Sequence, residues 1–111
     1  MKNYQHKSLA EGRWFAFTLA EQMANIGSEI SRIINWRAKG NQVYSQSAFE
    51  RALELIDLTV ADKKNRTYSK LKEILRLREA MVDYFWGRNE YNFDDKFWNN
   101  YFDKFNLLAR L

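Results

Sequence analysis

The sequence predicts an all-α protein, and specifically an up-down four-helix bundle with a long first helix at its centre. It has no proline and only 4 glycines in 111 residues, which is too few of either for a turn-rich β protein. Apolar residues recur at spacings of three and four in four segments joined by short polar stretches, the pattern of amphipathic helices. We expect residues 1–12 to form a polar N-terminal arm and residues 13–111 to form a single domain.

The longest uninterrupted helical pattern runs from about Arg13 to Lys39. Gly40 follows as a stop, because glycine adopts the left-handed conformation at a helix C-terminus at little cost. Beside an aliphatic stripe lies a stripe of small residues, which would let another helix approach closely. The aliphatic stripe is Leu19, Met23, Ile26, Ile30 and Ile33, and the small stripe is Ala16, Ala20, Ala24, Gly27 and Ser31. Two faces suited to burial make this the expected central helix.

Three further helices are predicted. The second runs from about Ser47 to Asp62, where Ser47 and Glu50 have the spacing of a capping box. The third spans about Tyr68 to Trp86 and stops at Gly87, and the fourth spans about Asp95 to Ala109. The apolar stripe expected on the third helix comprises Leu71, Ile74, Leu75, Met81, Val82 and Phe85.

Arg78 falls in the middle of that third stripe, where an apolar residue is expected. A buried, unpaired charge is costly, so the arginine must reach solvent or find a partner. Candidate partners are Glu29 or Asn25 on the first helix, or a carboxylate of a second subunit. Arg78 is then either half of a buried ion pair that fixes helix register, or an anion-binding group in a cleft.

The charge is mildly positive, with 18 basic residues, 14 acidic residues and a net charge of +4. This balance permits nucleic-acid binding without indicating it strongly. The densest cationic cluster is Lys63, Lys64 and Arg66, in the expected loop between the second and third helices. Together with Arg78, these residues are the candidate anion- or RNA-binding group, although a charged surface loop is the commoner explanation for such a cluster.

Aromatic residues are concentrated towards the C-terminus, between Tyr84 and Phe105. Closing the core, forming a subunit interface and stacking nucleic-acid bases are the three explanations, in that order. The candidate interface residues are Trp98, Tyr101, Phe102 and Phe105. We expect a homodimer on this basis.

Several function classes are excluded by composition. There is no cysteine and only one histidine, which rules out disulfides, thiol metal sites, and Ser-His-Asp or Cys-His catalytic sets built around a core histidine. The segment MKNYQHKSLAEGRW lacks the apolar centre of a signal peptide, and no apolar run is long enough to span a membrane. We expect a cytoplasmic protein without a cofactor.

The four-helix layout and the segment Arg78-Glu79-Ala80-Met81-Val82-Asp83-Tyr84 together resemble the HEPN superfamily of small helical domains. That family's hallmark is an arginine followed four to six residues later by a histidine, which forms a metal-independent ribonuclease site, commonly at a dimer interface. Here Asp83 stands where the histidine would be. The resemblance therefore implies RNA binding, or a degenerate ribonuclease that uses Arg78.

Three carboxylates, Glu50, Glu54 and Asp57, share one face of the second helix and could in principle hold a divalent metal. The pair Glu54 and Asp57 is similar to one fragment of the pattern in all-helical nucleotide pyrophosphohydrolases, but the partner Glu-Glu-x-x-Glu cluster is absent. Ordinary solvation explains these acids more simply. The preferred interpretation is a non-catalytic, homodimeric interaction or accessory protein, with the RNA-binding alternative second.

Overall fold

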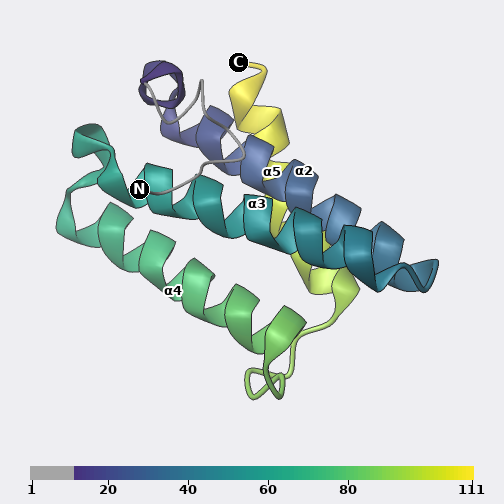
Figure 1. The fold of residues 1–111 in the computed structure, drawn as a ribbon. Helices are drawn as coiled ribbons and strands as arrows, with labels where there is room; N and C mark the ends of the chain where they lie inside the picture. Colours follow the sequence, from purple (N-terminus) through teal and green to yellow (C-terminus); the bar gives the residue numbers. More distant parts are fainter. Residues whose placement is uncertain (1–11) are drawn as a thin grey trace, which may run out of the picture.

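The computed structural model describes residues 12–111, and in this range it contains helices and loops with no strand (Figure 1). The all-α, four-helix prediction is confirmed. The predicted polar arm, residues 1–12, lies outside the described residues except for Gly12. The elements are the short 3-10 helices η1 (Arg13–Ala16) and η2 (Lys63–Asn65), and the α-helices α2 (Leu19–Ala38), α3 (Gln42–Ala61), α4 (Tyr68–Trp86) and α5 (Asp95–Ala109).

Helix α2 is central, as predicted, because it packs closely against both α3 and α5. Helix α3 packs in turn against α4, so α4 and α5 lie at the two ends of this series of contacts. Figure 1 shows α2, α3 and α4 side by side and alternating in direction, with α5 passing behind α2. As a result, α4 is supported along its length mainly by a single neighbouring helix.

The first helix is shorter than predicted, because the chain is not helical at Phe17 and Thr18. Thr18 begins α2 with a capping box: its Oγ1 accepts a hydrogen bond from the Glu21 backbone N–H at 3.1 Å, and its own N–H donates to Glu21 Oε1 at 2.9 Å. The residues before it form η1, which buries Trp14 completely. Helical spacing continues across this break, so periodicity alone predicted one uninterrupted helix.

The second helix begins earlier than predicted, at Gln42. Asn41 caps it by accepting a hydrogen bond from the Tyr44 N–H at 3.0 Å. The predicted capping box at Ser47 is wrong, because Ser47 lies inside the helix and its hydroxyl accepts a hydrogen bond from Arg51. The predicted bounds of the third and fourth helices match α4 and α5.

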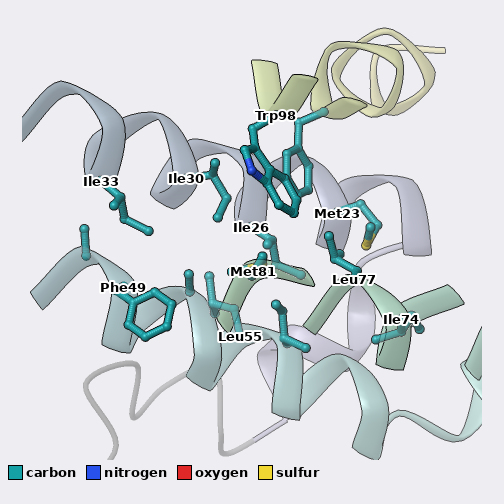
Figure 2. Packing of buried hydrophobic residues seen from close by; sticks show 14 of the residues in the cluster. Met23, Ile26, Ile30, Ile33, Phe49, Leu55, Ile74, Leu77, Met81 and Trp98 are labelled. Atoms are coloured by element: carbon teal, nitrogen blue, oxygen red, sulfur yellow. The ribbon is translucent and has the colours of Figure 1, made fainter. Parts of the chain in front are cut away.

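The core confirms most of the aliphatic stripe predicted for the first helix. Figure 2 shows residues of α2 meeting α3 from one side and Trp98 of α5 from the other, with α4 closing the cluster. The labelled buried residues are Met23, Ile26, Ile30, Ile33, Phe49, Leu55, Ile74, Leu77, Met81 and Trp98. Leu19, the first member of the predicted stripe, is only partly buried.

The small stripe of α2 serves the close approach of α5, as predicted, at Gly27. A Cβ atom at Gly27 would lie 2.8 Å from both Cβ and Cγ of Phe102. Glycine in a helix costs about 1 kcal/mol relative to alanine. Here the absence of a side chain at Gly27 allows Phe102 to pack directly on the α2 backbone.

A buried polar network joins the start of α2 to the end of α3. The Gln22 side-chain amide donates to the Trp14 carbonyl at 3.1 Å and to Asp62 Oδ2 at 2.8 Å. Its carbonyl oxygen accepts from Asn65 Nδ2 at 2.9 Å, and Asn65 also donates to the Thr59 carbonyl at 3.1 Å. The Trp14 indole N–H completes the set by donating to Thr59 Oγ1 at 3.1 Å. These bonds fix the point from which the chain enters α4.

Asp62 carries the network's negative charge. Burial by itself would raise the pKa of Asp62, but hydrogen bonds from Lys64 and Gln22 outweigh burial and hold the pKa below its usual value. Its carboxylate therefore contributes stability above the pKa of the unfolded chain, and this contribution is lost as the pH falls through the folded-state pKa.

We predict that Asp62→Asn lowers the free energy of unfolding at neutral pH by about 1–3 kcal/mol, because it places a donor opposite Gln22 and removes the charge opposite Lys64. The gap between wild type and variant should narrow below about pH 4, where the wild-type carboxylate is protonated as well. Urea unfolding of both proteins at pH 7, 5 and 3 measures the gap. A gap that stays constant over this range would contradict the assignment, and Asp103→Asn on exposed α5 surface is the control.

Candidate functional site

Helix α4 carries a second apolar stripe beside its core-facing side, which is exposed at Tyr68, Leu75 and Trp86 and packs partly against the core at Val82. Tyr68, Leu71, Leu75, Val82 and Trp86 fall at spacings of three, four, seven and four, which places them on one side of the helix. Tyr68 is 81%, Leu75 47% and Trp86 63% exposed, although the Trp86 ring also stacks on Phe49. We call this stripe the outer face of α4. An apolar stripe along a whole helix is more than scattered surface hydrophobicity.

Charged residues run beside the outer face in an ordered way. Lys72 and Arg76 lie in its N-terminal half, and Glu79 and Asp83 lie in its C-terminal half. The first three of these charges and the first three apolar residues form a shallow groove of about 320 Å³, lined by Tyr68, Leu71, Lys72, Leu75, Arg76 and Glu79. The surface is therefore apolar along its centre and carries opposite charges at its two ends.

A larger cleft separates α4 from α5 on the other side of α4. It has a volume of about 530 Å³, within the range of small-molecule sites. Its lining comprises Tyr68, Ser69, Lys72, Glu73, Arg76, Leu77 and Ala80 from α4, with Phe93, Phe97, Trp98 and Tyr101 from α5 and the loop before it. We call this the α4–α5 cleft. It shares Tyr68, Lys72 and Arg76 with the groove on the outer face.

Two tyrosines connect α4 to α5 across the cleft. Tyr101 donates its hydroxyl hydrogen to Glu73 Oε1 at 3.1 Å, and burial together with the Glu73 charge raises the pKa of Tyr101. Tyr84 donates to Asp95 Oδ1 at 2.6 Å, and burial together with Asp95 raises the pKa of Tyr84 to about 12. Both hydroxyls therefore remain protonated at neutral pH and hold the two helices together at this distance.

The loop between α4 and α5 is held by Asp83. Its carboxylate accepts hydrogen bonds from the backbone N–H groups of Glu90, at 2.8 Å, and Tyr91, at 3.1 Å. Asp83 is the residue that stands where the HEPN pattern has a histidine. Its carboxylate instead fixes the conformation of the loop between α4 and α5.

The structure gives Arg78 a different partner from those predicted. Its Nε donates to Asp57 Oδ1 of α3 at 3.0 Å, and both side chains are nearly half exposed, at 41% and 47%. The predicted partnership with Glu29 or Asn25 is wrong. Arg78 lies at the edge of the α3–α4 contact, so it reaches solvent and is not buried in the middle of the core.

Glu29 is instead buried between two other arginines. Arg32 Nη1 lies 2.7 Å from Glu29 Oε1, and Arg51 Nε lies 3.1 Å from Glu29 Oε2. This buried ionic group therefore joins α2 to α3. Sequence spacing placed the anomaly on Arg78, whereas the buried charges are the carboxylates of Glu29 and Asp62.

The cationic loop and Arg78 are not brought together into one site. Lys63, Lys64 and Arg66 lie in and just after η2, whereas Arg78 is ten residues into α4, about 15 Å along the helix axis from Tyr68. Lys64 pairs with Asp62 and donates to the Phe15 carbonyl at 3.2 Å, so it is used within the chain. Lys63 and Arg66 are exposed.

The four aromatic residues predicted for an interface divide into two pairs. Trp98 is 1% and Phe102 3% exposed, so both are used inside this chain's own core. Tyr101 and Phe105 are partly buried, and Lys104 Nζ lies over both rings, 4.4 Å and 4.9 Å from their centroids. Closing the core, the first explanation for the aromatic excess, therefore accounts for the largest of these rings.

Sequence reasoning missed the outer face and the cleft, because it placed Leu71, Leu75 and Val82 in the core stripe of α4. That assignment is wrong for Leu75, which is exposed, while Leu71 and Val82 are partly buried. The signal was present, since these residues lie about 100° around the helix from Ile74 and Met81. Two apolar stripes on one helix predict two separate contacts.

Within residues 12–111, no group of three or more acidic or histidine side chains is placed to hold a metal ion, so Glu50, Glu54 and Asp57 do not form such a cluster. None of the described helices combines the length and apolar character needed to cross a membrane. Comparison with known proteins gave no matching family model, no matching curated protein and no matching solved structure.

Arg78→Ala should lower the free energy of unfolding by less than about 1 kcal/mol, because half-exposed ion pairs contribute little. A double-mutant cycle with Asp57→Ala, measured by chemical unfolding, should give a coupling of about 0.2–1 kcal/mol. The matched comparison is Arg51→Ala, which should cost more because it removes a partner of buried Glu29. Removing one partner of a buried ion pair typically costs about 3–5 kcal/mol. A loss of that size for Arg78→Ala would contradict the half-exposed position of the Arg78 side chain.

Proposed function

We propose that this protein is a non-catalytic interaction module that self-associates as a homodimer through the outer face of α4. The observation that carries the proposal is the apolar stripe of that face, which includes highly exposed Tyr68 and Leu75. Burial of such a stripe against a second protein surface is favourable in proportion to the apolar area removed from water. The chain's lack of cysteine and its single histidine support a non-catalytic role.

Charge complementarity supports a second copy of the chain as the partner. The first part of α4, residues 68–78, is mainly basic, whereas residues 79–86 have only acidic charges. In the first part the charged residues are Lys70, Lys72, Glu73, Arg76 and Arg78, and in the second they are Glu79 and Asp83. Two copies of α4 packed antiparallel place basic and acidic parts opposite each other, whereas parallel packing opposes like charges.

A two-fold axis near Leu75 and Arg76 satisfies this arrangement. It packs Leu75 close to the axis and places Lys72 of one protomer opposite the partner subunit's Glu79. An interface of this kind is isologous, with the same surface contributed by both subunits. Because it rests on one helix pair, its area lies at the small end for stable complexes, and we expect reversible dimerisation at micromolar concentrations.

Sedimentation of the purified protein over a range from about 1 to 300 μM should show a monomer–dimer equilibrium. Leu75→Glu should raise the dissociation constant of the dimer by at least about tenfold, because the substitution would bury a carboxylate at the apolar centre of the interface. Leu107→Glu is the control, since Leu107 is also an exposed leucine, at 66% against 47% for Leu75, but lies on α5, off the outer face.

A charge exchange tests the orientation. Lys72→Glu and Glu79→Lys should each weaken the dimer, and the double variant should recover most of the loss because it restores opposite charges across the axis. The two residues are seven positions apart, so they do not pair within one helix. A monomer at all concentrations, or a dimer indifferent to Leu75→Glu, would refute the proposal.

RNA binding is the second candidate, and the position of Tyr68 favours it. The Tyr68 ring is exposed at the start of α4, just after the loop that contains Lys63 and Arg66, and Lys72 Nζ lies 5.5 Å from its centroid. An exposed ring beside cations is the arrangement on which single-stranded bases stack.

Labelled single-stranded RNA titrated at low and moderate salt measures this second candidate. We expect RNA binding that weakens as the salt concentration rises. Tyr68→Ala and Arg66→Ala should each weaken RNA binding, because the ring and the positive charge both contribute. Cleavage that disappears in folded Arg78→Ala would support the ribonuclease form. Absence of binding at both salt concentrations would remove RNA from consideration.

A further inference from the structure

The α4–α5 cleft has an apolar interior that no side chain of the described structure fills. Leu77 and Trp98 at its base are almost fully buried, and Ala80 between them contributes only a methyl group. Figure 2 shows Leu77 and Trp98 on neighbouring helices, directed towards the same part of the core. The base of the cleft is therefore continuous with the core, and a ligand seated there would extend it.

One wall of the cleft consists of stacked aromatic rings. The Phe93 and Phe97 rings lie 3.9 Å apart between centroids and 8° from parallel, and Tyr101 continues the stack at 6.0 Å and 30° from Phe97. A flat wall of rings favours a flat ligand, because offset stacking adds to the free energy of area burial. The wall selects a flat apolar body over a branched one.

Two of the three charged groups that line the cleft are cationic. Lys72 and Arg76 stand one helical turn apart on α4 and are exposed, whereas the one carboxylate in the lining, Glu73, is engaged by the Tyr101 hydroxyl. An apolar site with a few convergent polar groups is typical of small-molecule binding. Two cations above an apolar floor complement a ligand that combines an apolar body with one negative charge.

We propose that the α4–α5 cleft binds a small aromatic anion, whose ring system lies against Phe93 and Phe97 and whose acidic group lies between Lys72 and Arg76. The acidic group is a carboxylate, sulfonate or phosphate, since all three accept hydrogen bonds from lysine and arginine. The site shares Tyr68, Lys72 and Arg76 with the groove on the outer face of α4, but Leu75, at the centre of that face, does not line it. It does not depend on self-association of the protein.

Two dyes that differ by one charge test this proposal. 8-Anilinonaphthalene-1-sulfonate has the flat body and the anion, and N-phenyl-1-naphthylamine has the same body without the sulfonate. Fluorescence titration of the intact protein should show saturable binding of both dyes, with the sulfonate dye bound about ten-fold more tightly or better, which corresponds to one charge-assisted hydrogen bond. Equal affinities for the two dyes, or no binding of either, would overturn the proposal.

Variants locate the dye within the cleft. Arg76→Gln should weaken binding of the sulfonate dye by about five-fold and change the affinity of the neutral dye by less than about two-fold, whereas Arg110→Gln, at an exposed position after the end of α5, should change neither. Ala80→Trp should abolish binding of both dyes by filling the cleft. Should Ala80→Trp fail to fold, Phe97→Ala replaces it and must weaken both dyes.

The same dye titration with the Leu75→Glu variant tests binding in the cleft independently of dimerisation. Binding retained in that variant, at the affinity that the wild-type protein shows when diluted to monomer, assigns the dye to the α4–α5 cleft. Loss of binding would place the dye on the outer face and overturn the cleft assignment. A protein that proves monomeric at every concentration leaves the dye result fully interpretable, because the cleft lies within one chain.

Discussion

The side-chain amide of Gln22 joins four segments at one end of the bundle, and the rest of the architecture depends on that connection. Its two donated hydrogen bonds reach the Trp14 carbonyl and Asp62, and its oxygen accepts from Asn65. Every one of these polar groups is buried, so each lost bond would leave a desolvated group without a partner. The network thereby sets where α3 ends and in which direction the chain leaves for α4.

Support of α4 from one side explains both of its unusual surfaces. Ile74, Leu77 and Met81 attach it to the core, while the tyrosine bridges to Glu73 and Asp95 keep α5 at a distance. Closer packing of α5 is directed elsewhere, onto the α2 backbone at Gly27. Because α5 packs close to α2 at that contact, a cleft remains between α5 and α4. The opposite flank of α4 has no helix packed on it within the described residues. Self-association and ligand binding are proposed on these two flanks.

Lys72 and Arg76 lie between the two flanks and line both of them. In the proposed dimer they face the acidic half of a second α4, and in the proposed complex they hold an anion. Use of the same charges in both places implies an energetic coupling between dimerisation and ligand binding, which must be reciprocal. Helix α4 is then the element through which one event would influence the other.

The sequence by itself determined what depends on nearby residues. Absence of proline, helical spacing and stop signals such as Gly87 were enough for the fold class and for the bounds of α4 and α5, because helix formation and capping act over a few residues. Tertiary structure decided the rest. The break before Thr18 required a buried site for Trp14 near Thr59, and Arg78 met Asp57 because α3 and α4 pack in a particular register. Which side of α4 stays exposed likewise depended on where α5 crosses α2, a contact between residues far apart in the chain that no local pattern encodes.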